Sequence, residues 1–204
     1  MNQIDALQRL KKIGPQVFET RDATALLAVS AANANVILAR LAKQGLLTHL
    51  ARGRWVMGRS IARFALPEMI IAPHPAYVSL QSALFHRGII EQIPAVIYAV
   101  TLARPRRITT PLGTISFHRL PPELFLGFEV DDDGAKIASA EKALFDVLYL
   151  APGRSRLFAR LPELEFPREF RWSRVRDYAR LVQSTTRRTF IRRRIGEIQR
   201  GVLR

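Results

Sequence analysis

The chain contains no cysteine among its 204 residues, which excludes disulfide bonds, thiolate metal sites and a cysteine nucleophile. It has no run of about 18 apolar residues, so we expect no membrane-spanning helix and no membrane partner. The first residues, MNQID, show neither the basic nor the apolar region of a secretory signal. These absences favour a cytoplasmic protein.

Motifs for enzymatic chemistry are also missing. Neither a P-loop nor a G-x-G-x-x-G pattern occurs, and the four histidines are scattered without ligand spacing. The acids of 131–133 are consecutive, and three adjacent side chains in a turn cannot all point at one ion. Glu141 is explained as a first-turn acid that meets a helix dipole. We therefore expect no metal, no cofactor and no enzymatic activity.

Positive charge is in excess and unevenly distributed. The net charge is +15, from 32 Lys and Arg against 17 Asp and Glu. Residues 1–59 and 151–204 carry nearly all of this excess, whereas residues 60–150 are close to neutral. Two basic ends favour binding of polyanions, and the alternative is that arginine-rich helices only keep the protein soluble.

Residues 20–57 have the order helix, turn, helix, hairpin. The elements that we expect are helices over 20–27 and 31–44 and strands over 46–50 and 54–57. Thr20 and Ser30 are suitable N-caps for the two helices, and Gly45 is a suitable stop for the second. Such an order is typical of a winged helix-turn-helix, which places a helix in the major groove of DNA and a wing on its backbone.

The helix over 31–44 is predicted to turn one side to DNA. Its buried side would hold Ala34, Ile37, Leu38 and Leu41. Asparagine pairs bidentately with adenine and small apolar side chains touch thymine methyls, whereas basic side chains suit phosphates. The candidate DNA-binding residues of this helix are Ser30, Ala32, Asn33, Asn35, Val36, Arg40 and Lys43. The alternative for the asparagines is a role in the helix start and its solvation.

The expected wing adds two more candidates. Arg52 and Arg54 flank a tight turn, which would bring two guanidinium groups together against a phosphate or a minor groove. Trp55 is expected to pack under the wing rather than touch DNA.

The rest of the chain predicts a mixed α/β domain that ends in basic helices. We expect an α+β protein with three parts: a DNA-binding domain over 1–59, a connector over 60–76 and a second domain over 77–204. The expected elements outside the motif are helices over 3–13 (ended by Gly14-Pro15), 60–66, 78–87, 140–150, 173–182 and 186–200, a strand over 95–101, and hairpins over 107–118 and 124–138. The loop at Glu91-Gln92 either docks a helix on the next strand or faces a partner.

Two phrases in the second domain carry a family resemblance. They are YVSLQSALFHRGIIEQIP, over 77–94, and IASAEKALFD, over 137–146. Together with the preceding motif they resemble the AbiEi family, the antitoxins and transcriptional regulators of bacterial type IV, or abortive-infection, toxin–antitoxin systems. The resemblance implies repression of the chain's own operon at inverted-repeat operators, an antitoxin activity in the second domain, and a nucleotidyltransferase-like toxin as partner, with direct contact left open.

The last expected helix has a dense basic segment. Its arginines are Arg187, Arg188, Arg192, Arg193 and Arg194, and they accompany an apolar stripe that includes Ile191 and Ile195. We expect the stripe to pack inward and the arginines to face outward, as an anion or partner surface or as a solvated face. Two other functions remain open: a recognition subunit or nuclease acting on nucleic acid, and a basic module that binds RNA or protein.

Overall fold

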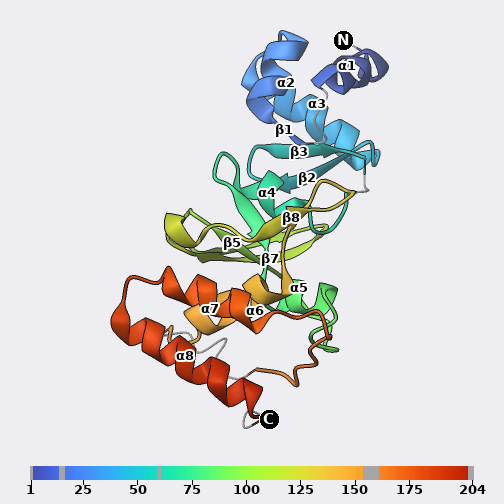
Figure 1. Ribbon diagram of the computed structural model, residues 1–204. Coiled ribbons are helices and arrows are strands. Elements are labelled where there is room, and N and C mark those ends of the chain that lie inside the picture. The colour runs from blue at the N-terminus through green and yellow to red at the C-terminus, as the bar shows by residue number, and fades with distance from the viewer. Residues whose placement is uncertain (1, 14–16, 59–60, 154–160, 202–204) are drawn as a thin grey trace.

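The computed structural model describes residues 2–13, 17–58, 61–153 and 161–201 of this α+β protein (Figure 1). The helices are α1 (Gln3–Leu10), α2 (Thr20–Leu27), α3 (Ala31–Lys43), α4 (Leu66–Ile71), α5 (Leu80–His86), α6 (Ala140–Leu150), α7 (Trp172–Arg180) and α8 (Thr185–Gln199), with 3₁₀ turns η1 (Lys11–Ile13) and η2 (Pro122–Leu124). The strands are β1 (Val17–Glu19), β2 (Leu47–Ala51), β3 (Arg54–Met57), β4 (Ala76–Val78), β5 (Ile97–Thr101), β6 (Arg106–Thr110), β7 (Gly113–Arg119), β8 (Phe128–Val130) and β9 (Lys136–Ala138).

The elements stack along the length of the molecule. Helices α1–α3 lie at one end, the small sheet lies beneath them, and α5–α8 cover the far side of the large sheet at the other end (Figure 1). The small sheet is antiparallel with order β1-β3-β2. The large sheet has order β6-β7-β5-β4-β9-β8, with parallel pairs β5–β7 and β4–β9. No single helix in the described ranges is long and apolar enough to cross a bilayer; α2 and α3 meet that test only as a bent pair.

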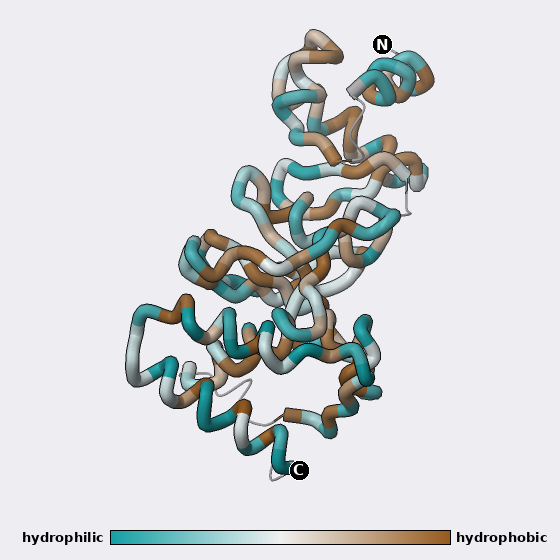
Figure 2. Tube along the Cα trace, viewed as in Figure 1, coloured by the Kyte–Doolittle hydropathy of each residue, from teal (hydrophilic) through white to brown (hydrophobic). Residues whose placement is uncertain are grey.

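Two apolar cores hold the stack together, and the small sheet contributes to both. One core joins α1–α3 to Phe18, Leu47 and Trp55 of the sheet. The other fills the space around the large sheet and includes Leu50 and Val56 from the same small sheet. Apolar segments accordingly run through the middle of the molecule in Figure 2. The N-terminal unit is therefore packed on the second one rather than tethered to it.

Several expected elements are confirmed with their end signals. Ser30 is the N-cap of α3, where its Oγ accepts the N–H of Asn33, and Gly45 follows the helix with a φ of 74°. Ser139 caps α6 in the same way, through the N–H of Lys142. The hairpins β2–β3 and β6–β7 form at the expected turns. Capping and turn chemistry were thus sufficient to place these elements.

One expected N-cap and one expected helix start are wrong. The N-cap of α2 is Glu19, whose N–H donates to Asp22 Oδ2 at 2.7 Å, and Thr20 is already helical. Thr20 instead accepts the indole N–H of Trp55 at 2.9 Å. The helix expected from Val78 begins at Leu80, because Val78 pairs in β4 with its neighbours on both sides.

The connector contains a helix in a different place from the expected one. It forms at Leu66–Ile71, where Pro67 occupies the first turn, a position that proline tolerates because no N–H is needed there. Leu66, Ile70 and Ile71 are buried in the second core. Residues 61–76 are thus part of the packed structure, whereas Ser60, like Gly14 and Pro15, lies outside the described residues.

Candidate nucleic-acid interface

The turn between α2 and α3 sets the direction of the second helix. The two helices meet at an angle of 105°. Ala28 ends α2 in the left-handed conformation, with a φ of 53°, and Val29 N–H donates to the carbonyl of Thr24. Such a cap satisfies the last carbonyls of α2 and reverses the chain within a few residues. As a result α3 starts directly from the end of α2 at Ser30.

Helix α3 is buried on one side and open on the other. Ala34, Leu38 and Leu41 are fully buried, and Ile37 is half-buried, as expected. The exposed candidates are Ala32, Asn33, Asn35, Val36, Arg40 and Lys43. Within the described ranges no hydrogen bond or ion pair involves the side chains of this exposed set. The exposed side of α3 therefore offers amide, apolar and cationic groups to a ligand.

The turn of the β2–β3 hairpin is short and anchored to α2. Thr20 N–H donates to the carbonyl of Gly53 at 2.8 Å, which holds the turn against the helix start. Arg52 is exposed at this turn. Arg21, beside Thr20, has a side chain that is 80% exposed and forms an ion pair with Glu19 at 2.9 Å. Sequence reasoning missed Arg21, although its place beside the expected cap of α2 was a usable signal.

Arg54 does not fit the predicted DNA-binding role. Its side chain is only 16% exposed and lies 3.6 Å from Glu19 Oε1. Its guanidinium donates to the carbonyl of Met69 at 3.1 Å and also to those of Ile70 and Ala72. These carbonyls end α4, where a helix lacks donors and carries partial negative charge. Arg54 therefore ties the hairpin to the connector, and Arg52 is left as the cation of the turn.

Trp55 packs inside the N-terminal unit, as expected. It is 7% exposed, and its ring lies 4.4 Å from that of the exposed His49. Its indole N–H is satisfied by Thr20 Oγ1. Trp55 thus holds α2, β2 and β3 together and leaves no part of its ring for a base.

The C-terminal arginines do not form a single outward surface. The apolar stripe is confirmed, since Ile191 and Ile195 are buried. Arg187 stacks over the ring of Tyr149 at 4.6 Å, and Arg188 donates to the carbonyls of Val182 and Gln183. Arg193 and Arg194 both pair with Glu197, at 3.5 and 3.3 Å. Of these five arginines, Arg192 and Arg193 are exposed and the other three are half-buried. The helical period turns those three toward neighbouring elements.

A buried polar cluster in the second domain was missed by sequence reasoning. Lys142 and Asp146, one turn apart on α6, form an ion pair with both side chains 0% exposed. Asp146 Oδ2 also accepts the hydroxyls of Tyr77 at 3.0 Å and Ser79 at 2.7 Å. Rings of Tyr77, Phe145 and Tyr178 surround the Lys142 ammonium at 5.0 to 5.7 Å. The available signal was Lys and Asp at i,i+4 on the apolar side of an expected helix.

Burial governs the titration of this cluster. It lowers the pKa of Lys142, and the adjacent carboxylate of Asp146 opposes that shift. It also raises the pKa of Asp146, against the effect of Lys142 and of the two hydroxyl donors. The Tyr77 phenol has its pKa raised well above the ordinary value by burial and then by Asp146. No solvent-accessible face remains on the pair, so it holds β4 and α6 together and offers no site to a ligand.

Several described acidic residues outside this cluster accept backbone N–H groups. Asp131 Oδ1 accepts the N–H groups of Asp133 and Ala135, as expected for a solvated turn. Glu141 is 7% exposed and accepts the N–H of Arg171, which begins α7. Within the described ranges no group of three or more histidines and acids is arranged to hold a metal ion.

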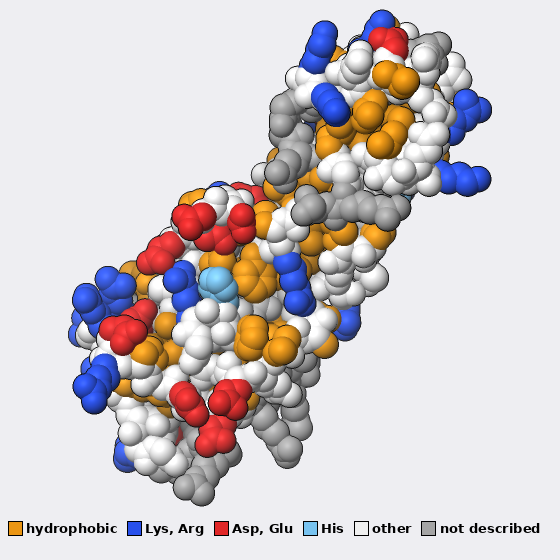
Figure 3. All heavy atoms as spheres, turned by 90° about the vertical axis from the view of Figure 1, so that its right-hand side faces the viewer, with side chains coloured by type: hydrophobic (Ala, Val, Ile, Leu, Met, Phe, Trp, Pro, Cys, Tyr) orange, Lys and Arg blue, Asp and Glu red, His pale blue; other side chains and the backbone are white. Residues whose placement is uncertain are grey.

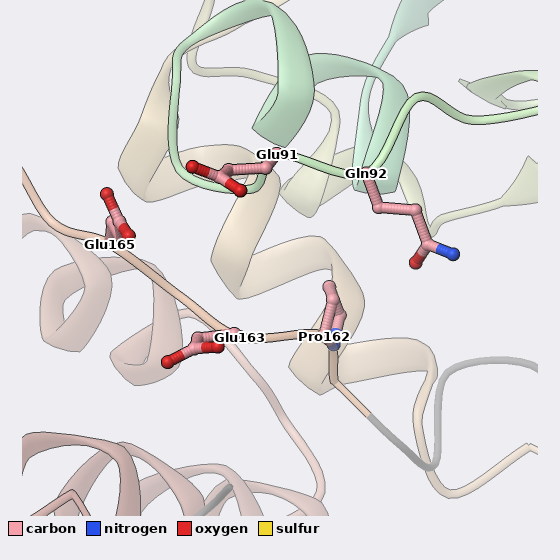
Figure 4. Close-up of a pocket in the computed structure, with 5 residues that line it drawn as sticks. All are labelled: Glu91, Gln92, Pro162, Glu163 and Glu165. Atoms are coloured by element: carbon pink, nitrogen blue, oxygen red, sulfur yellow. The ribbon is translucent and has the colours of Figure 1, made fainter.

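The loop after α5 lines an acidic pocket of about 330 Å³. Glu91 and Gln92 border the pocket on one side, and Glu163 and Glu165 border it on the other. The side chains of Glu91 and Glu165 point toward the same opening, whereas that of Gln92 points away (Figure 4). The N–H of Glu165 donates to the carbonyl of Ile89, which joins the two segments. The loop thus docks the chain before α7, as well as facing solvent.

Basic side chains are present on both units, but acidic ones are sparse on the N-terminal unit (Figure 3). On the face shown in Figure 3, Lys and Arg side chains project from several sides of the N-terminal unit, whereas most of the acidic ones lie lower, over the second unit. No family model matches this chain. No curated protein matches it either.

Proposed function

We propose that the N-terminal unit is a winged helix-turn-helix that binds double-stranded DNA through α3. The observation that supports this most strongly is the exposed side of α3, which has no partner within the described residues and follows α2 at 105°. Helix pairs at about 90–120° joined by a short turn are the arrangement in which the second helix enters a major groove. The basic charge of residues 1–59 suits a phosphate backbone.

The chemistry of α3 assigns different roles to its two ends. Asn33 and Asn35, near the start, are suited to adenine edges, with Ala32 and Val36 placed for thymine methyl groups. Arg40 and Lys43, near the end, are suited to phosphates. We therefore expect a preference for sites with A·T pairs, with Arg52 from the hairpin turn as a further phosphate contact.

We further propose that the chain represses its own operon and acts as the antitoxin of a type IV toxin–antitoxin pair. The support is the resemblance to the AbiEi family. The two segments of this chain that carry it, residues 77–94 and 137–146, contact each other in the structure. Tyr77 and Ser79 of the first phrase bind Asp146 of the second. The two segments thus form one buried contact of the second domain. The proposed partners are an inverted-repeat operator and a nucleotidyltransferase-like toxin, in the cytoplasm and without enzymatic activity of the chain itself.

DNase footprinting of the region upstream of the gene tests the repressor proposal. We expect paired protected half-sites and a steep decline of affinity with salt, because each phosphate contact releases counterions. Absence of a protected site at moderate salt would contradict the proposal. Co-expression with a nucleotidyltransferase-like toxin gene that adjoins this one tests the antitoxin activity separately, through rescue of growth by the full chain.

A further inference from the structure

We propose that the β6–β7 hairpin of the second domain is an additional phosphate-binding element that contacts the DNA flank next to the α3 site. The inference rests on the proposed DNA binding and extends it to residues outside the N-terminal unit. It is carried by three observations: an acid-free basic segment, its place beside α3 and β2, and the opposite charge of the other sheet edge.

The hairpin has cations and no acids of its own. Residues 92–122 contain no Asp or Glu. The basic side chains of this segment are Arg104, Arg106, Arg107 and Arg119, and all four are exposed. Within the described residues none of these four takes part in an ion pair, unlike Arg54, Arg87 or Arg194. The near-zero net charge of residues 60–150 conceals this segment, because the acids of that range lie elsewhere.

The topology places this segment beside the proposed DNA site. β6 is an edge strand of the large sheet, and its hairpin meets β2 of the small sheet. A cleft of about 460 Å³ lies between them, lined by Ala42 and His49 on one side and by Thr109 and Pro111 on the other. Ala42 immediately precedes Lys43, the last cation of α3. The turn end of the hairpin therefore lies beside the end of α3, and the arginines follow from there along β6 toward its start.

The two edges of the large sheet differ in charge. Arg106 and Arg107 lie on β6, and successive strand residues point to opposite faces, so these cations project on both sides of that edge. The other edge, β8, carries Glu129 and leads into the acidic turn of 131–133. A polyanion is attracted to the first edge and repelled from the second. This polarity favours a nucleic acid that extends from α3 along β6.

Charged side chains on a sheet edge also protect it from pairing with other chains. Protection alone explains neither Arg104, which lies before the strand, nor the lack of acids in the whole segment. Duplex DNA is the favoured occupant because the neighbouring α3 presents the side chains suited to a major groove. Single-stranded RNA is the competing ligand that the experiment separates.

The test compares two triple variants of the full chain. In the hairpin variant, Arg104, Arg106 and Arg107 are replaced by glutamine. In the α7 variant, the same replacement is made at the exposed Arg168, Arg174 and Arg176, which lie near or on α7 at the opposite end of the molecule (Figure 1). Both lose the same net charge. Binding is measured by fluorescence anisotropy on a random-sequence duplex of about 40 base pairs at several salt concentrations, since phosphate contacts need no specific site.

We expect the hairpin variant to lose up to about 0.9 in the slope of log K against log salt for each contact removed. If all three contacts are lost, raising the salt from about 50 to about 200 mM should weaken DNA binding by the hairpin variant about 40-fold less than binding by the parent chain. The α7 variant should keep the slope of the parent chain. A single Arg104→Gln change, outside the strand, should lower the slope by about 0.9 without opening the sheet edge.

Equal slopes for the hairpin and α7 variants would overturn the proposal, because only net charge would then matter. An unchanged slope for Arg104→Gln in folded protein would also count against it. Loss of binding to single-stranded RNA of the same length, with duplex binding intact, would replace DNA by RNA as the ligand. Failure of the parent chain to bind any duplex would instead refute the proposed function itself.

Discussion

The buried pair of Lys142 and Asp146 gives the most quantitative prediction for the second domain. Removal of one partner leaves the other charge buried without compensation, and that charge can be discarded only by a change of protonation. We therefore expect Lys142→Met and Asp146→Asn each to be strongly destabilising. The double variant should regain most of the loss, since no charge remains in the cluster.

The structure limits how large each loss can be. In Lys142→Met, Asp146 is fully buried and must take up a proton, which costs about 4 kcal/mol at pH 7 for a carboxyl whose unfolded pKa is about 3.9. At pH 5 the same step costs only about 1.5 kcal/mol. The folded pKa of Asp146 lies above its unfolded value, so this penalty grows as the pH rises and disappears at low pH. The Tyr77 and Ser79 hydroxyls stabilise the charged form and can reduce the loss.

Urea unfolding of the full chain, followed by circular dichroism at pH 7 and pH 5, measures these differences. Arg9→Met is a matched control, because Arg9 and Asp5 have the same i,i+4 spacing but side chains that are 46% exposed. Such a pair should contribute less than about 1 kcal/mol at either pH. The reasoning fails if Lys142→Met loses the same free energy at both pH values, or if the double variant is no more stable than the single ones.

Three further predictions concern other parts of the chain. Asn33→Ala or Asn35→Ala should reduce the preference for operator over random DNA by about 1–3 kcal/mol in competition binding, whereas an equal loss on both DNAs would assign the asparagines to capping or backbone contacts. Arg54→Ala should lower the free energy of unfolding by about 2–3 kcal/mol, because helix-end carbonyls lose a charged donor, and should leave the salt slope of DNA binding unchanged. Burial lowers the pKa of His118 to about 4. The folded chain therefore binds a proton at this imidazole less tightly than the unfolded chain does. The free energy of unfolding should decline by about 3 kcal/mol as the pH falls from about 6.5 to 4. His118→Gln should flatten that decline in acid-titrated unfolding curves, and an unaltered curve would refute the assignment.

Local signals in the sequence were enough for most of the fold. Ser30 and Ser139 are N-caps, and Gly45 and Gly53 adopt positive φ where a helix ends and a hairpin turns. Each of these features depends on a few neighbouring residues, which is why it can be inferred from one sequence. The short helix α4 escaped this reasoning because its buried side is defined by the second core and not by its own six residues.

Side-chain partners distant in sequence could not be inferred in this way. Arg54 has the charge and turn position of a phosphate ligand, yet the carbonyls of Met69 and Ile70 take its guanidinium. Arg188 looked like part of a free basic helix and instead donates to the carbonyls of Val182 and Gln183 in the connection between α7 and α8. In both cases backbone carbonyls of another segment or of the preceding connection take the cation, and the sequence does not say which carbonyls lie nearby.

Charge summed along the sequence is a poor guide to charge in space for the same reason. The middle of the chain is nearly neutral in total, but the strand order β6-β7-β5-β4-β9-β8 places Arg106 and Arg107 at one edge of the sheet and Glu129 and the acidic turn of 131–133 at the other. Helix α8 shows the reverse, because four of its five clustered arginines contact Tyr149, Glu197 or backbone carbonyls. A cation is available to a polyanion only where the fold leaves it without a carboxylate or carbonyl partner. By that criterion, the exposed side of α3 and the β6–β7 hairpin are better candidates for nucleic-acid contact than the arginine-rich helix.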